Sequence, residues 1–407
     1  MSTTMQLWQI FWCFLKLGCT SFGGPIAHIS FFRTEFVVNK GWLTERDYFD
    51  LVALCQFLPG PASSQVGMAI GLLRGGYTGA LFAWLGFTLP SALLMLGLAL
   101  GLGRFAEIVP PGVLHGLKLA ALAVIAQAVY AMTKNYCATW KTAVIAGLSL
   151  LLLSLSTAAY WQVFSIVCGA LLGIVWLQAT PSSKAEPAKL LTNISKTAGL
   201  CWGLLFLLML VGLPVFNHEL PSPIVSTFDA FFRAGSLVFG GGHAVLPMLQ
   251  ADFVSTGAVS ADSFIAGYGA VQAVPGPLFT FAGFLGASID ADFINPTTGL
   301  SMTGGLWGGV LGLIAIFTPA FLLVAAVLPF WQDVRNNPWM QKAMAGIGAS
   351  VVAILLHTLY HPVWTSTILS VLDFVFAVMA LLALHFRKIN LWQLVLLSAV
   401  CGYFFRI

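Results

Sequence analysis

Long apolar runs separated by short polar segments set the pattern of this chain. Typical runs cover residues 80–102, 119–132, 142–155 and 201–213. A helix needs about 20 mostly apolar residues to cross a bilayer, whereas a transmembrane β-strand shows about ten residues of alternating polarity. Sustained apolarity without that alternation predicts an all-α polytopic membrane protein.

The apolar runs form two sets of about six helical elements, with one further helix between the sets. The polar residues 180–196, which include two prolines, separate the first set from the joining helix. We therefore divide the chain into a first repeat at 1–178, a linker with the joining helix at 179–223, and a second repeat at 224–407. The predicted helices cover 7–30, 46–73, 76–103, 112–133, 141–157, 160–178, 197–214, 224–250, 263–288, 303–330, 340–360, 363–384 and 390–406.

Motifs of the first set recur in the second set at a nearly constant offset along the chain. Colinear matches of this kind predict two related halves, whereas a single shared glycine would mean little. The matched pairs are Phe22-Gly23-Gly24-Pro25 with Phe239-Gly240-Gly241-Gly242, Gln56 with Gln272, Pro59-Gly60-Pro61 with Pro275-Gly276-Pro277, Lys16 with Arg233, and Glu35 with Asp252.

The basic residues indicate how the halves are oriented. If each half crosses the membrane an even number of times, the joining helix inverts the second half, a common transporter architecture. Most bases fall on one predicted side, which the positive-inside rule makes cytoplasmic. These bases are Arg74, Lys134, Lys141, Lys184, Lys189, Lys196, Arg335, Lys342, Arg387 and Lys388.

One predicted loop conflicts with this orientation. Residues 31–46 hold Arg33, Lys40 and Arg46, yet full spans place them outside, and the matched loop 251–262 has no Lys or Arg, yet would lie inside. Re-entrant first and second elements in both halves remove both conflicts. The alternative is thirteen full spans, and the sequence leaves both open.

Composition agrees with a membrane protein and excludes several other classes. Of 407 residues, 59% are hydrophobic and 8% charged, against about a quarter charged in soluble domains. The first residues lack the basic region and cleavage site of a signal peptide, so we read the first apolar run as mature protein. The seven cysteines stand singly, which suggests neither a metal site nor a disulfide framework. Metalloprotease, serine-hydrolase and P-loop signatures are absent, so we expect no enzyme.

The matched motifs are the candidate binding site. A Pro-Gly-Pro inside a membrane helix interrupts the hydrogen-bond ladder, and such backbone is tolerated at membrane depth only where it is buried or lines a cavity. Interrupted helices in matching positions point to a site between the repeats, and bare helix N-termini suit an oxyanion. The alternative is that the motifs are only kinks or packing points.

Several polar side chains could complete such a site. Lys16 and Arg233 are matched cations in apolar sequence and could hold a dianion. The alternatives are that both side chains extend to a membrane interface, or that Asp229 neutralises Arg233 at i,i+4. The amides of Gln56 and Gln272 could donate to an oxyanion or tie down loose backbone. Further candidates are His243, beside the second glycine motif, and the acids Glu35 and Asp252, which could accept protons during coupling.

The paired motifs Phe22–Pro25 with Gln56-x-x-Pro59-Gly60-Pro61, repeated as Phe239–Gly242 with Gln272-x-x-Pro275-Gly276-Pro277, resemble the long, two-domain members of the chromate ion transporter family. The resemblance covers nearly the whole chain. It implies a secondary active transporter in the bacterial inner membrane that exports chromate, confers chromate resistance and uses the proton motive force. It also implies functional roles for these motifs, although Gly242 stands where Pro25 has its match, so the two sites need not be equivalent.

The expected substrate is chromate, with sulfate as a competitor because both are tetrahedral dianions of similar shape. Transport of sulfate or another anion is the alternative function. We expect the lipid bilayer as surroundings, no cofactor, no metal and no nucleic-acid partner, with a homodimer as the candidate assembly.

Overall fold

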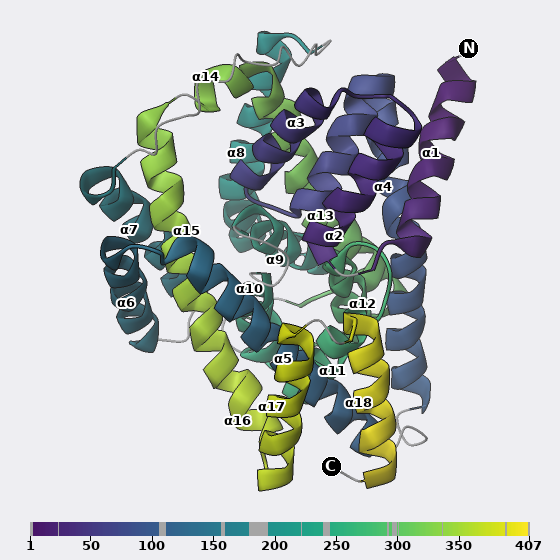
Figure 1. The fold of residues 1–407 in the computed structure, drawn as a ribbon, viewed down its shortest axis with the longest axis vertical. Helices are drawn as coiled ribbons and strands as arrows, with labels where there is room; N and C mark the ends of the chain where they lie inside the picture. Colours follow the sequence, from purple (N-terminus) through teal and green to yellow (C-terminus); the bar gives the residue numbers. More distant parts are fainter. Residues whose placement is uncertain are drawn as a thin grey trace.

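The computed structural model describes residues 3–22, 24–105, 111–155, 159–178, 194–220, 222–238, 245–290, 293–294, 299, 301–335, 337–386 and 389–405. These residues are almost entirely helical, as Figure 1 shows. The first half contains α1 (Thr3–Thr20), α2 (Gly24–Arg33), the π-helix η1 (Thr34–Asn39), α3 (Glu45–Phe57), α4 (Ala62–Phe105), α5 (Pro111–Tyr136), α6 (Trp140–Ser154) and α7 (Ala159–Trp176).

Helix α8 (Lys196–Glu219) joins this half to the second, and most of the linker before it lies outside the described residues. The second half contains α9 (Pro223–Ser236), α10 (Leu246–Leu249), η3 (Gln250–Val254), α11 (Ala261–Val271), η4 (Leu278–Thr280), α12 (Phe281–Ser288), α13 (Gly305–Val327), η5 (Leu328–Phe330), α14 (Trp331–Arg335), α15 (Pro338–Thr358), η6 (Leu359–Trp364), α16 (Thr365–Thr367), α17 (Val371–His385) and α18 (Leu391–Phe405).

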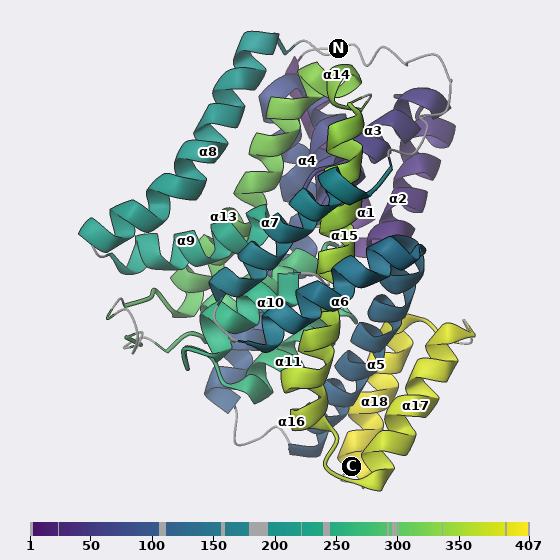
Figure 2. The same cartoon turned by 90° about the vertical axis from the view of Figure 1, so that its left-hand side faces the viewer.

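Five helical stretches among the described residues are long and apolar enough to cross a membrane. Together with the helical content, they confirm the predicted all-α polytopic membrane protein. The joining helix α8 is one of the five, and Figure 2 shows it at the edge of the molecule, where it packs against α13 and α9. The five stretches are Ala62–Gly101, Gly112–Tyr136, Lys196–Glu219, Gly305–Phe330 and Pro338–Thr367.

Each of the first two predicted elements of the first half folds back as a hairpin: α1 pairs with α2 and η1, and α3 pairs with the first arm of α4. The Gln6 side chain donates to the Arg74 carbonyl (2.7 Å), and the Arg74 guanidinium lies 5.0 Å from the Trp42 ring. The start of α1, the loop after η1 and the bend in α4 therefore share one end of the molecule (Figure 1). That bend falls at Gly75 and Gly76, where Gly76 has φ +63. The basic loop of the first half therefore lies at the same end as Arg74, which is the arrangement that the re-entrant alternative predicts.

Matched residues of the two halves make matched contacts. Phe14 packs on Phe36 with ring centroids 4.8 Å apart, and their counterparts Phe231 and Phe253 stack at 4.5 Å.

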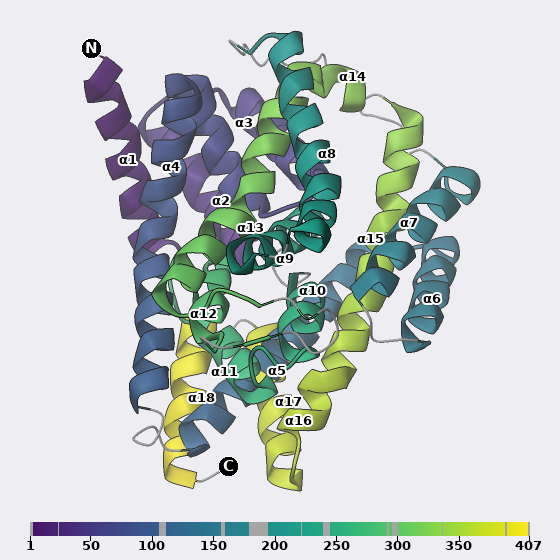
Figure 3. The same cartoon turned by 180° about the vertical axis from the view of Figure 1, so that it is seen from behind.

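The matched helices, the second arm of α4 and α13, lie side by side and run antiparallel (Figure 3). Tyr77 meets Phe321 and, further along α4, Trp84 meets Phe317. Antiparallel matched helices are what inverted repeats require.

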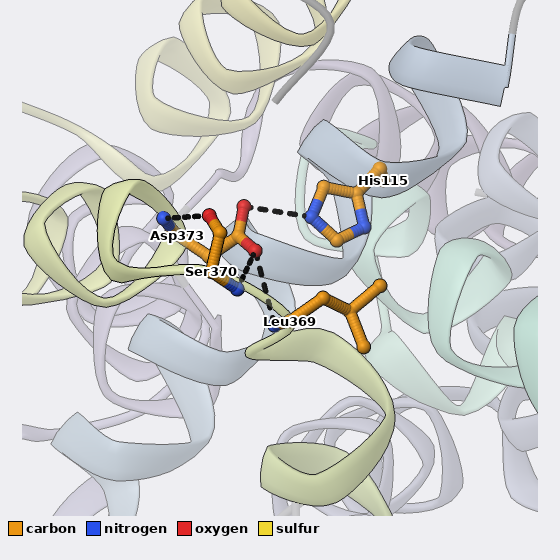
Figure 4. Close-up of polar contacts among 4 residues, drawn as sticks. All are labelled: His115, Leu369, Ser370 and Asp373. Atoms are coloured by element: carbon orange, nitrogen blue, oxygen red, sulfur yellow. Dashed lines mark hydrogen bonds and ion pairs between the residues drawn. The ribbon is translucent and has the colours of Figure 1, made fainter.

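Polar contacts attach α5 of the first half to the second half. His115 Nε2 lies 2.9 Å from Asp373 Oδ1, and Lys118 on the same face pairs with Asp262. Figure 4 shows that the other Asp373 oxygen accepts from the backbone N–H groups of Leu369 and Ser370 at 3.0 and 2.8 Å. Ser370 in turn caps α17 by accepting from the Asp373 N–H.

Replacing Asp373 with alanine should lower the free energy of unfolding by about 2 kcal/mol, because α17 loses part of its cap and the partly buried His115 loses its partner. Thermal unfolding of the purified protein in detergent measures the change. Asp333→Ala is the control, because the Lys196–Asp333 pair (3.2 Å) is exposed and such pairs contribute little. Equal effects of the two substitutions would contradict a stabilising role for the α5–α17 contact.

Candidate anion-binding site

A cavity of about 750 Å³ lies where the interrupted helices of the two halves approach α5 and α18. Several predicted site residues line it, and these come from both halves. None of its described lining residues carries a charged side chain, so polarity comes from amides, hydroxyls and backbone. The predicted residues that line the cavity are Phe22, Gly24, Pro25, Gln56, Gly60 and Gln272.

The two Pro-Gly-Pro segments interrupt their helices as predicted. Helix α3 ends at Phe57 and α4 begins at Ala62, while α11 ends at Val271 and η4 begins at Leu278. The central glycines adopt φ +118 at Gly60 and φ +102 at Gly276, a backbone conformation open almost only to glycine.

Each interrupted segment is completed by the opposite half. The Gly60 N–H donates to the Val238 carbonyl at 2.6 Å, and the Gly276 N–H donates to the Ser21 carbonyl at 2.9 Å. Ser21 and Val238 are matched positions that immediately precede the two Phe-Gly-Gly motifs. The halves are therefore joined by a reciprocal pair of hydrogen bonds at the edge of the cavity.

Gln272 lines the cavity, and its amide nitrogen is buried behind the cavity wall. Its side chain lies beside that of Tyr268 and is buried, with the residue only 7% exposed. Its Nε2 atom is buried and has no hydrogen-bond partner in the structure. Because a buried amide normally has partners, this unpaired donor next to the cavity is a candidate contact for a ligand or a water molecule. Its counterpart Gln56 is exposed and lines the same cavity.

Other predicted site residues lie outside the cavity lining. Five residues of the two Pro-Gly-Pro segments flank the cavity and determine the direction of the backbone there: Pro59, Pro61, Pro275, Gly276 and Pro277. Gly23 and residues 239–244, which include Phe239, Gly240, Gly241, Gly242 and His243, lie outside the described residues.

Lys16 and Arg233 do not line the cavity either. The Lys16 ammonium lies 3.8 Å from Glu35, and its side chain is 68% exposed. Arg233 lies 3.1 Å from Asp229 and 3.7 Å from Asp252. The i,i+4 pairing of Asp229 with Arg233, the alternative raised by the sequence, is thus present, and the two cations form no joint clamp in this cavity.

Some polar lining residues were missed by the sequence reasoning. Gln127 and Asn135 on α5 and Asn390 at the start of α18 bring three more amides to the cavity. The signal was available for α5, because two amides spaced by about two turns lie on one face of an otherwise apolar helix. Gln65 was also missed, and its Nε2 donates to the Pro59 carbonyl at 2.8 Å, which stabilises the first break.

Comparison with known proteins identifies relatives along the whole chain. The family model described as chromate transporter matches residues 8–174 and 225–403. A chromate transport protein of Cupriavidus metallidurans is 25% identical over 406 residues, 98% of this chain and 93% of that protein. A chromate transport protein of Pseudomonas aeruginosa is 26% identical, over 85% of this chain and 79% of its own length.

A shorter relative matches a smaller part. An uncharacterized transporter of Bacillus subtilis is 30% identical over 149 residues, which are 35% of this chain and 82% of that protein. No solved structure matches the chain significantly.

Proposed function

Because the chain belongs to the chromate transporter family, we propose that it exports chromate across the bacterial inner membrane by secondary active transport and thereby confers chromate resistance. The observation that carries the proposal is the amide-lined cavity at the two crossed helix breaks. Two inverted repeats, 1–178 and 224–407, would alternate access to this cavity by moving against each other, as in other transporters with inverted repeats.

In this proposal, neutral donors hold the chromate dianion. Gln56, Gln127, Asn135 and Gln272 surround the cavity with amides, each of which offers two N–H donors. Oriented dipoles stabilise charge strongly in a site shielded from water. A site without cations also releases its anion easily, and a transporter needs a site that its substrate can leave.

An excess of sulfate of about tenfold should lower chromate flux several-fold, because the same amide donors fit both tetrahedral dianions. Uptake of labelled chromate into everted membrane vesicles measures the effect. Chloride at equal ionic strength is the control and should leave the flux nearly unchanged. If sulfate had no more effect than chloride, the shared tetrahedral site would be wrong.

The same vesicles test direction and the alternative function. Accumulation of chromate in everted vesicles corresponds to export from the cell, whereas accumulation only in right-side-out vesicles would indicate uptake. If labelled sulfate were accumulated and chromate were not, transport of sulfate would replace the proposal.

A further inference from the structure

Asp229 and Arg233 on α9 and Asp252 on η3 form a cluster of three charged groups, which we name the acidic triad. Arg233 Nε lies 3.1 Å from Asp229 Oδ2, and an Arg233 terminal nitrogen lies 3.7 Å from Asp252 Oδ1. The side chains of Asp229 and Asp252 are 7% and 15% exposed, and that of Arg233 is 34% exposed. The triad is thus mostly shielded but retains contact with the surface through the guanidinium.

One cation in the triad faces two carboxyl groups. With both acids ionised, the triad carries one uncompensated negative charge in a poorly solvated place, which is unfavourable. Asp229 Oδ1 adds a second observation, because this oxygen is buried and has no hydrogen-bond partner. A proton on one carboxyl group would neutralise the triad.

In the part of the chain that the structure describes, the surrounding elements do not compensate this charge. Helix α9 packs on α8, α10 and α13, and neither α10 nor α13 carries a charged residue. The nearby end of α8 contributes Asn217, which accepts from Ser226, while His218 and Glu219 are exposed and pair with each other. Next to η3, Asp262 of α11 is paired with Lys118.

The matched cluster of the first half has the opposite balance. There Glu35 lies 3.8 Å from Lys16 and 3.9 Å from Lys40, so two cations face one acid. Glu35 thus faces more positive than negative charge, although it occupies the position that matches Asp252. The difference arises because Trp12 stands where Asp229 has its match and Gly257 stands where Lys40 has its match.

We propose that the acidic triad is the proton-binding site of the transporter, with Asp229 and Asp252 sharing the coupled proton. The proposal rests on the proposed function as a secondary active exporter, and takes as the driving ion the proton that the family resemblance implies. The proposal assigns different roles to the two matched acids: Asp252 binds the coupled proton together with Asp229, whereas Glu35 has no role in coupling.

The triad lies close in sequence to the cavity edge. The Leu237 N–H donates to the Arg233 carbonyl, and the carbonyl of the following residue, Val238, accepts from the Gly60 N–H. Gly60 lines the cavity. A change in how Arg233 is held can therefore reach the first helix break through the end of α9, which links proton binding to the anion site.

The test compares Asp229→Asn and Asp252→Asn with Glu35→Gln, the matched first-half control, in proteoliposomes. Each triad variant should lose chromate accumulation driven by a pH gradient by about tenfold or more, the range of typical coupling energies. Exchange of labelled for unlabelled chromate at equal pH on both sides should persist, which also shows that the variant is folded. Glu35→Gln should retain gradient-driven accumulation. Gradient-driven accumulation that survives in both triad variants would overturn the proposal.

A second measurement separates this proposal from the proposed function. Infrared difference spectra of the wild-type protein between acidic and neutral pH should show the carbonyl band of a protonated carboxyl group, and Asp229→Asn should remove it or shift it. This readout needs no substrate. If the carbonyl band of the triad appeared in a protein that transports no chromate, only the proposed function would be wrong. If chromate were transported but the band were absent, only the proposed proton site would be wrong.

Discussion

Replacing Gly276 with alanine should abolish chromate transport, with a loss of flux of at least about tenfold. The residue adopts φ +102, and a side chain in such a conformation costs about 1–3 kcal/mol. An added Cβ would also lie 2.8 Å from Ser91 Oγ, which is too close, and 3.3 Å from the Phe87 carbonyl oxygen, which is a tight contact with backbone. To relieve the contact, the chain must move, and the Gly276 N–H would then lose the Ser21 carbonyl on the opposite half.

Chromate uptake into everted vesicles, normalised to the protein in the membrane, measures this loss. The matched control is Gly257→Ala, because Gly257 also has positive φ (+85) but nothing lies within 4 Å of the place that a Cβ would take there. The control should show backbone strain without loss of the contact between the halves. Equal flux in Gly276→Ala and wild type would show that the crossed hydrogen bonds are not needed for transport.

Replacing Gln272 with leucine should weaken chromate binding by about tenfold to a hundredfold. Leucine has a similar size but offers no donor, and a hydrogen bond to a charged group contributes about 1.5–3 kcal/mol. Glutamate at this position should weaken binding further, because its carboxylate would face a dianion. Equilibrium binding of labelled chromate to the purified protein in detergent measures both effects.

Gln162→Leu is the control for the amide, since Gln162 donates to the Pro247 carbonyl (3.0 Å) and does not line the cavity. It should leave chromate affinity nearly unchanged. If Gln272→Leu bound chromate as tightly as the control variant, the Gln272 amide would not contact the anion. The proposed binding site would then be wrong at this residue.

The helices and the places where they break could be predicted from the sequence. Apolar runs fix the helices because a bilayer accepts little else, and the Pro-Gly-Pro motifs around Gly60 and Gly276 must interrupt a ladder wherever they occur. Matching the motifs also located two of the five amide side chains among the described residues that line the cavity, Gln56 and Gln272.

The positions of the two cations could not be predicted in the same way. Two residues related by an approximate two-fold axis meet only if they lie near that axis, and the sequence offset carries no information on that distance. Lys16 and Arg233 are matched but each is paired with acids of its own half, whereas the amides of Gln56 and Gln272 reach one cavity. Asp229 was foreseen only as a neutralising neighbour, because it has no acidic counterpart in the first half.

Each half depends on the other for a backbone hydrogen-bond partner, because Gly60 donates to Val238 and Gly276 donates to Ser21. A bilayer offers no water to an amide left unpaired at depth, so either half made alone would insert with its break exposed. If the chain were cut within the linker and produced as two polypeptides, neither fragment should accumulate unless the other were synthesised in the same cell. The covalent link supplies both in equal number.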